Sequence, residues 1–337
     1  MRLTIMRYFG CFIYLWLLLA MPLAARTIRI YVSNRNARVV SVIDPVTDKV
    51  VQTIEDIEVP RWIDFSPDGR RVYVTNEGEE VIDVVDQKTG KIIKKVAVSG
   101  HPNMVSASKD GRRLIVCIRS APGAVDVVDT TSLTLRKTIP VKGGLHDGYV
   151  TPDSKYAVVG SISGKIVTVI DLQSEEIAWE VKMGDGVRPM AIETNPDGST
   201  RRIFVQLTSL RGFAVVDFAT HQVVNRIKFP DEPKWYDEET ADLDAAHGIE
   251  VAPDGKSLWV NSTSTRTVFA YSLPDLKLLG QARVGRSPGW ITFTPDSKKV
   301  YVSAEGALSV VDAKTMKEMA RIQLADSSGE SKTLVLP

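Results

Sequence analysis

The sequence predicts an all-β protein, a seven-bladed β-propeller with four antiparallel strands per blade. Three observations support this fold: four strand-like runs form a unit, the unit contains no helical pattern, and it recurs along the chain. Its copies begin 44, 42, 43, 46, 55 and 42 residues apart, at Ile28, Val72, Leu114, Ala157, Ile203, Leu258 and Val300. A period of about 40–50 residues with four strands per unit is typical of propeller blades.

Residues 1–25 precede the repeat and differ from it. Arg2 and Arg7 stand before the apolar run 8–19, and small residues close the segment at Ala24 and Ala25. This layout predicts a signal peptide cleaved after Ala25, a propeller domain over 26–337, and a periplasmic or secreted protein. The alternative is an uncleaved membrane anchor, because residues 8–25 are barely long enough to span a bilayer.

Within a unit, the innermost strand comes just before a tight turn, as at Pro67-Asp68-Gly69. Equivalent turns follow at Lys109, Pro152, Pro196, Pro253 and Pro295. The second and third strands are almost continuously apolar, as expected when neighbouring blades cover both faces of a sheet. The outer strand alternates with charged residues, as in 91–96, which suits a half-exposed edge.

The third strand of most units ends in aspartate, which invites a metal or catalytic interpretation. Six copies have this residue: Asp44, Asp86, Asp129, Asp171, Asp217 and Asp312. Each stands directly before a turn, where an aspartate side chain accepts hydrogen bonds from the backbone. The row therefore predicts turn caps and not a carboxylate cluster.

The first unit begins at a second strand and lacks an innermost one. The apolar tail 332–336 is the candidate for that strand. We expect this C-terminal strand to pair with the first blade and close the ring.

Composition excludes several classes of protein. The 337 residues are 44% hydrophobic and 25% charged, which is ordinary for a globular chain, and the net charge of +1 gives no basis for nucleic-acid binding. Cleavage of the leader would leave Cys117 as the single cysteine, in an apolar run. We expect it to be a buried side chain with no internal disulfide.

Two of the four histidines fall at equivalent positions of different blades. Counting six residues back from each turn gives Arg61, Asn103, His146, Met190, His247 and Gly289. These positions lie where a blade's inner strand enters at the channel mouth. With neighbouring residues, they predict a ligand-binding mouth formed by Arg61, Trp62, Asn103, His146, Asp147, Met190, His247 and Trp290.

The two imidazoles leave several roles open. They could ligate a cofactor iron or another metal, or one could act as a general base. No His-x-x-x-His spacing supports a metal site formed by the protein alone, so none is predicted. The simplest alternative is that they are polar residues bound to water and backbone.

The long fifth unit carries an acidic insertion at 229–246. Seven carboxylates accompany one lysine there, and the core of the segment is Trp235, Tyr236, Asp237, Glu238 and Glu239. A long loop in a regular repeat is often functional. It could be a lid over the mouth, a partner-docking arm, a calcium site or an inert loop.

The repeat resembles the YVTN-family β-propeller repeat. Tyr73-Val74-Thr75-Asn76 matches that pattern literally, and residues 31–34 and 301–304 match it loosely. The resemblance implies a seven-bladed, usually exported propeller. Some similar propellers are lactonases, others belong to haem-containing nitrite reductases and haem maturation proteins, and others are accessory proteins of quinone-dependent alcohol oxidation.

The leading functional prediction is an exported scaffold that binds an unidentified small molecule or protein partner at the mouth, without catalysis. The alternatives are an enzyme or cofactor protein using His146 and His247, lactonase-like or haem-binding, and a quinone-oxidation accessory protein. The sequence identifies no cofactor. It predicts membrane contact only through an uncleaved leader.

Overall fold

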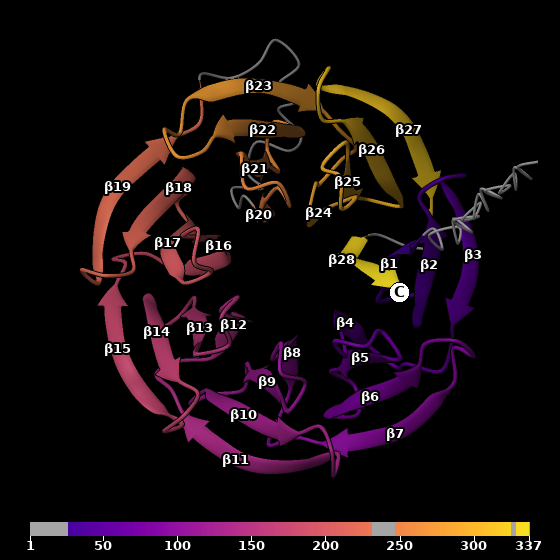
Figure 1. Cartoon of the computed structure of the whole chain (residues 1–337), viewed down its shortest axis with the longest axis vertical. Helices are drawn as coiled ribbons and strands as arrows, with labels where there is room; N and C mark the ends of the chain where they lie inside the picture. The colour runs from indigo at the N-terminus through magenta and orange to yellow at the C-terminus, as the bar shows by residue number, and fades with distance from the viewer. Residues whose placement is uncertain (1–25, 231–246, 325–327, 337) are drawn as a thin grey trace, which may run out of the picture.

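The repeat forms four-stranded antiparallel sheets in the computed structural model, and the sheets stand around a central axis (Figure 1). The structure describes residues 26–230, 247–324 and 328–336, and within these ranges there are seven sheets. The predicted seven-bladed propeller is confirmed. The predicted leader 1–25 and the core of the acidic insertion, including Trp235, Tyr236, Asp237, Glu238 and Glu239, lie outside the described residues.

Every blade runs from an innermost strand beside the axis to an outermost strand at the rim. In this order, blade 1 contains β28 (Ser328–Leu336), β1 (Thr27–Asn34), β2 (Val39–Asp44) and β3 (Lys49–Ile54). Blade 2 contains β4 (Pro60–Phe65), β5 (Arg71–Asn76), β6 (Val81–Asp86) and β7 (Ile92–Ala97). Blade 3 contains β8 (Pro102–Ala107), β9 (Arg113–Ile118), β10 (Ala124–Asp129) and β11 (Thr134–Pro140). Blades 4 and 5 contain β12 (Leu145–Val150), β13 (Tyr156–Ser161), β14 (Ile166–Asp171) and β15 (Glu176–Lys182); β16 (Val187–Thr194), β17 (Thr200–Leu207), β18 (Leu210–Asp217) and β19 (Gln222–Lys228). Blades 6 and 7 contain β20 (Ile249–Val251), β21 (Ser257–Ser262), β22 (Thr267–Ser272) and β23 (Leu278–Arg283); β24 (Ile291–Phe293), β25 (Lys299–Ala304), β26 (Ala307–Asp312) and β27 (Lys317–Gln323).

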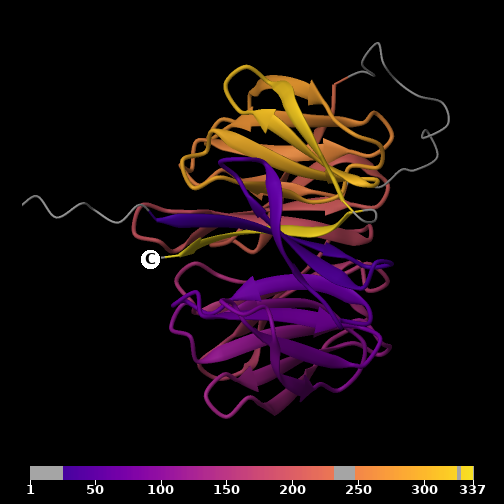
Figure 2. The same cartoon turned by 90° about the vertical axis from the view of Figure 1, so that its right-hand side faces the viewer.

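The C-terminal strand closes the ring, as the sequence predicts. β28 pairs antiparallel with β1, in a register that runs from Thr27 opposite Leu336 to Val32 opposite Ser331. Figure 2 shows the yellow strand lying against the first indigo strand. Blade 1 is therefore built from both ends of the chain and has four strands like the other described blades.

The core consists of the second and third strands of neighbouring blades. Their apolar side chains are buried on both sheet faces, for example Val72 and Val74 of β5 and Val84 and Val85 of β6. The outer strands leave apolar side chains such as Val51 and Ile93 exposed between charged ones. This is the burial gradient that the sequence predicts from the inside of a blade to its edge.

The aspartates that end the third strands are turn caps. The Asp86 carboxylate accepts hydrogen bonds from the Thr89 backbone N–H at 2.8 Å and from the Thr89 hydroxyl at 2.7 Å. The hydroxyl bond and the backbone bond lower the pKa of Asp86. Caps of the same kind occur at Asp44, Asp129, Asp171, Asp217 and Asp312. The capping prediction is confirmed, and these carboxylates are not available as a catalytic row.

Cys117 is fully buried, and burial raises the pKa of its thiol well above the usual range. The prediction that Cys117 is a buried side chain is confirmed. Among the described residues, no helix has the length and apolar character needed to cross a membrane.

Candidate functional site

A cavity of about 410 Å³ opens at the channel mouth. Six of the eight predicted mouth residues line it: Arg61, Trp62, Asn103, His146, His247 and Trp290. They come from the inner ends of blades 2, 3, 4, 6 and 7. Residues far apart in the chain thus meet at one rim.

Local irregularities at the start of the inner strands set the direction of these side chains. The pairing of β4 with β5 shifts between Pro60 and Ile63, and that of β12 with β13 shifts between Leu145 and Asp147. Such bulges re-aim side chains at the end of a strand. Arg61 and His146 lie within these two shifted segments and line the cavity.

His146 and His247 meet at the mouth, with ring centroids 5.2 Å apart and planes at 76°. Nδ1 of His146 lies 2.7 Å from Oδ2 of the buried Asp147. Because that carboxylate occupies Nδ1, the other ring nitrogen of His146 is left for a ligand. This is the arrangement in which a second residue fixes the tautomer of a ligating histidine.

His247 packs against Trp290, with ring centroids 4.7 Å apart. Burial lowers the pKa of His247 well below its usual range, and the nearby charges of His146 and Arg188 lower it further. The ring is therefore neutral at physiological pH, which is the form that can bind a metal.

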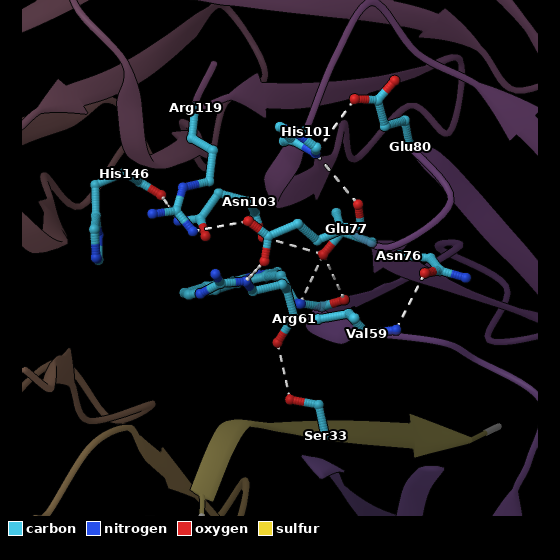
Figure 3. A network of polar contacts seen from close by, with 12 residues as sticks. Ser33, Val59, Arg61, Asn76, Glu77, Glu80, His101, Asn103, Arg119 and His146 are labelled. Carbon is cyan, nitrogen blue, oxygen red and sulfur yellow. Dashed lines mark hydrogen bonds and ion pairs between the residues drawn. The ribbon is translucent and has the colours of Figure 1, made fainter. Parts of the chain in front are cut away.

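The Arg61 side of the mouth is held by a polar network, shown in Figure 3. The Glu77 carboxylate pairs with Arg61 and, at 2.8 Å, with Arg119. Burial alone would raise the pKa of Glu77, but the hydrogen bonds and charges of the two arginines outweigh it and lower the pKa. Asn103 donates from its side-chain amide to the carbonyl of His146. These contacts make the rim between blades 2 and 4 a pre-organised wall.

Met190 does not line the cavity. It is fully buried in an apolar cluster with Val158, Val187 and Val205. The inner hairpin of blade 5 is longer than the others. Its turn closes with a hydrogen bond from the Asn195 N–H to the Ser199 carbonyl. Ile192 pairs with Ile203, as Phe65 pairs with Val72 in blade 2, so more residues lie between the paired positions in blade 5.

Alignment by strand pairing places Arg188, and not Met190, at the position of Arg61. Counting back from the turn proline therefore misses by two residues in this blade. The 46-residue step from Ala157 to Ile203 was the signal in the sequence that could have revealed the longer hairpin. Arg188 is partly buried, which lowers its pKa, while the Asp147 charge acts in the opposite direction.

Further lining residues come from loops and from the closing strand, which the repeat pattern does not locate. They include Arg35, Thr263, Ser287, Pro288 and Glu330. Glu330 is buried and accepts a hydrogen bond from Ile63 N–H at 2.9 Å. Burial raises the pKa of Glu330 well above its usual range, although the Lys332 charge opposes that shift.

Among the described residues, no group of three or more His, Cys, Asp and Glu side chains could hold a metal ion. A metal at this mouth would therefore need ligands besides those that the described residues supply.

The family model for the Cytochrome D1 heme domain matches residues 26–148. The matched segment contains Arg61, Asn103, His146 and Asp147. No curated protein sequence matches the chain. The resemblance to the YVTN repeat stays a prediction.

Three solved structures share the fold. Hydrazine synthase from Kuenenia stuttgartiensis has a TM-score of 0.70 and 18% identity, with 88% of this chain and 92% of that chain covered. The dihydro-heme d1 dehydrogenase NirN in complex with DHE has a TM-score of 0.66 and 16% identity, with 90% and 74% covered. A putative 6-phosphogluconolactonase from Bacteroides fragilis NCTC 9343 has a TM-score of 0.73 and 16% identity, with 93% and 99% covered. At these identities the likeness is one of fold.

Proposed function

We propose that the channel mouth binds a haem d1-like tetrapyrrole, with His146 as the residue that faces its metal. The observation that carries the proposal is the His146–Asp147 pair, 2.7 Å apart and within the segment matched by the Cytochrome D1 heme domain model. The carboxylate orients the ring and increases its basicity, as residues behind metal-bound histidines do.

The charge of the mouth suits an anionic ligand. Arg35 and Arg61 line the cavity, with Arg61 paired to Glu77, whereas the carboxylate that lines the cavity, Glu330, has a raised pKa. A tetrapyrrole carries peripheral carboxylates, for which arginine is the preferred partner. Trp62 and Trp290, whose rings pack edge to face, supply apolar surface for the macrocycle.

His247 has a different role in this proposal. Two imidazoles on opposite sides of one metal would have their centroids roughly 6 Å apart, given metal–nitrogen bonds of about 2.0 Å. His146 and His247 are closer, at 5.2 Å, and are packed edge to face. His247 would therefore not share the metal with His146, and its neutral ring could exchange a hydrogen bond with the ligand.

When bound, such a group supplies redox chemistry at its iron. The residues of this chain would bind and orient it. The proposal is one of binding, and the absence of catalysis stays a prediction. Export to the periplasm or beyond also stays a prediction, since it rests on residues 1–25.

Spectroscopic titration tests the proposal. The chain purified without a tetrapyrrole should give a saturable Soret shift with iron protoporphyrin and a stronger one with haem d1. His146→Ala should abolish the ligand-field signature. His221→Ala is the matched control, because His221 stacks on Trp179 at 4.3 Å in the outer part of a blade. Equal spectra for wild type and His146→Ala would refute the assignment.

A second readout is the colour and metal content of the protein purified from its native host. A chromophore with iron is expected. Protein that is colourless there, and that also fails to bind either tetrapyrrole in the titration, would exclude this function.

A further inference from the structure

A second chamber lies below the mouth in the same channel. Its volume is about 400 Å³, and it shares Trp62, Trp290 and Glu330 with the mouth cavity. The indole rings of the two tryptophans touch edge to face, with centroids 4.5 Å apart. They form the floor of the mouth cavity and the roof of the second chamber, which we call the lower chamber.

The lower chamber faces the opposite end of the propeller. Pro253 and Pro295 line it, and both belong to turns that follow innermost strands. The mouth, in contrast, is lined by Arg35, Ser287 and Pro288 from loops at the other end. A ligand in the lower chamber would therefore enter separately from one at the mouth.

Apolar and aromatic side chains form most of the chamber wall, including Tyr149, Ile249 and Phe293. Charged groups enter it from two elements, Glu250 on β20 and Glu330 and Lys332 on β28. An apolar chamber with a few convergent polar groups is the usual form of a small-molecule site.

The charges in the chamber do not balance. Lys332 is already committed, because its ammonium lies 3.0 Å from the carboxylate of Asp64. Glu250 and Glu330 then have no cation of their own among the described residues that line the chamber. Burial raises the pKa of Glu250 to about 7, against the opposing charge of Lys332. The chamber thus holds two carboxyl groups, and burial makes ionisation of each unfavourable.

Two buried polar groups of the wall also have no hydrogen-bond partner among the described residues. They are Nε1 of Trp62 and Oγ of Ser331, whose residues are 5% and 4% exposed. Native interiors rarely leave such groups unsatisfied, so an unpaired group at a cavity wall indicates a missing partner. The Ser331 hydroxyl can accept a hydrogen bond from a cation, whereas the Trp62 N–H is a donor only and needs an acceptor.

We infer that the lower chamber is a second binding site, which takes a small organic ammonium ion with an apolar body. The ammonium would sit between Glu250 and Glu330, and the body would lie against Trp290 and Phe293. A cation on the face of an aromatic ring gains further stabilisation when it is desolvated. An anion is disfavoured, because the only ammonium facing the chamber from the described residues is held by Asp64.

Binding of a cation should release protons. The groups that face Glu250 are Glu330 and Lys332 on β28 and Tyr149 on β12. A bound ammonium favours the ionised form of Glu250, whereas the empty chamber favours the protonated form. Affinity should therefore rise as the pH increases from 6 to 8 and level off once Glu250 is ionised before binding.

Three isosteric probes test the site by calorimetry at pH 8: benzylammonium, benzyl alcohol and benzoate. Saturable binding is expected for benzylammonium, with about tenfold or greater weakening for the neutral alcohol, because the charge pair is lost. Benzoate should not bind. At pH 6.5, titrations in two buffers of different ionisation enthalpy should show proton release. No binding of benzylammonium, or binding of benzoate as tight, would overturn the inference.

Variants locate the site. Glu250→Gln should weaken benzylammonium binding about tenfold or more, and Glu330→Gln should do the same. Glu305→Gln, on an exposed turn, is the control and should bind as wild type. Because Glu330 also lines the mouth, Glu250→Gln is the deciding variant, and unchanged binding by it would refute the site. His146→Ala should leave benzylammonium binding intact, which separates this test from that of the tetrapyrrole.

Discussion

Closure of the ring can be tested at a single side chain of the last strand. Leu334 on β28 is 5% exposed and packs in a cluster with Tyr31, Ile63 and Phe65. Leu334→Ala removes a buried isobutyl group that joins the C-terminal strand to blades 1 and 2. The truncation leaves a cavity where the chain closes on itself.

The expected cost follows from burial. Transfer of a leucine side chain out of water contributes about 1.5–3 kcal/mol, and an unfilled cavity adds to the loss on truncation. The partly buried Leu336 lies beside Leu334 and can relax into part of the space. We therefore expect Leu334→Ala to lower the free energy of unfolding by about 2–3 kcal/mol, near the lower end of measured Leu→Ala values.

Equilibrium unfolding in urea measures this quantity through the transition midpoint, with an unchanged slope if the unfolded state is unaffected. Val335→Ala is the matched control, because the neighbouring side chain on the same strand is 37% exposed. It should cost less than about 0.5 kcal/mol. Equal costs for the two variants would refute the packing of β28 against blades 1 and 2. Deletion of residues 328–337 should be far more damaging, since it also leaves Asp64 without Lys332.

Three further predictions concern single side chains. Asp147→Asn should weaken tetrapyrrole binding about 10–100-fold, because residues behind a metal-bound histidine contribute that much, and unchanged titration curves would contradict the role given to the carboxylate. Asp83→Asn should stabilise the fold at pH 8 and have little effect near pH 4. Burial raises the pKa of Asp83 to about 6, above its value in the unfolded chain. Between about pH 6 and 4 the folded state therefore binds more protons than the unfolded state, and the wild type gains stability as the pH falls. Urea midpoints at the two pH values check this, and a gain from Asp83→Asn that does not depend on pH would show that charge is not the cause. Cys117 should resist an aromatic disulfide reagent in the native protein and react in urea, as followed by mass spectrometry of its peptide, because its thiol is fully buried; rapid native labelling would show that blade 3 opens.

The repeat made the blade architecture readable from the sequence. Alternating apolar runs, turn residues such as Pro67-Asp68-Gly69 and capping aspartates such as Asp86 act locally, over spacings that hardly vary. The number of blades and the closing role of residues 332–336 followed from counting strands. The pairing of His146 with His247 could also be anticipated, because a circular repeat brings equivalent positions to one rim.

The tertiary structure decided the details that depend on register and on contacts between distant segments. Two extra residues at the end of the inner strand of blade 5, just before its turn, put Arg188 at the position equivalent to Arg61 and buried Met190 in the core. The lower chamber has its charges because Glu330 and Lys332 on β28 lie close to Glu250 and Asp64 on other strands. A sequence pattern specifies which face of a strand is buried. It does not specify which charges from different strands will share one cavity, and that sharing sets the pKa values and the ligand preference.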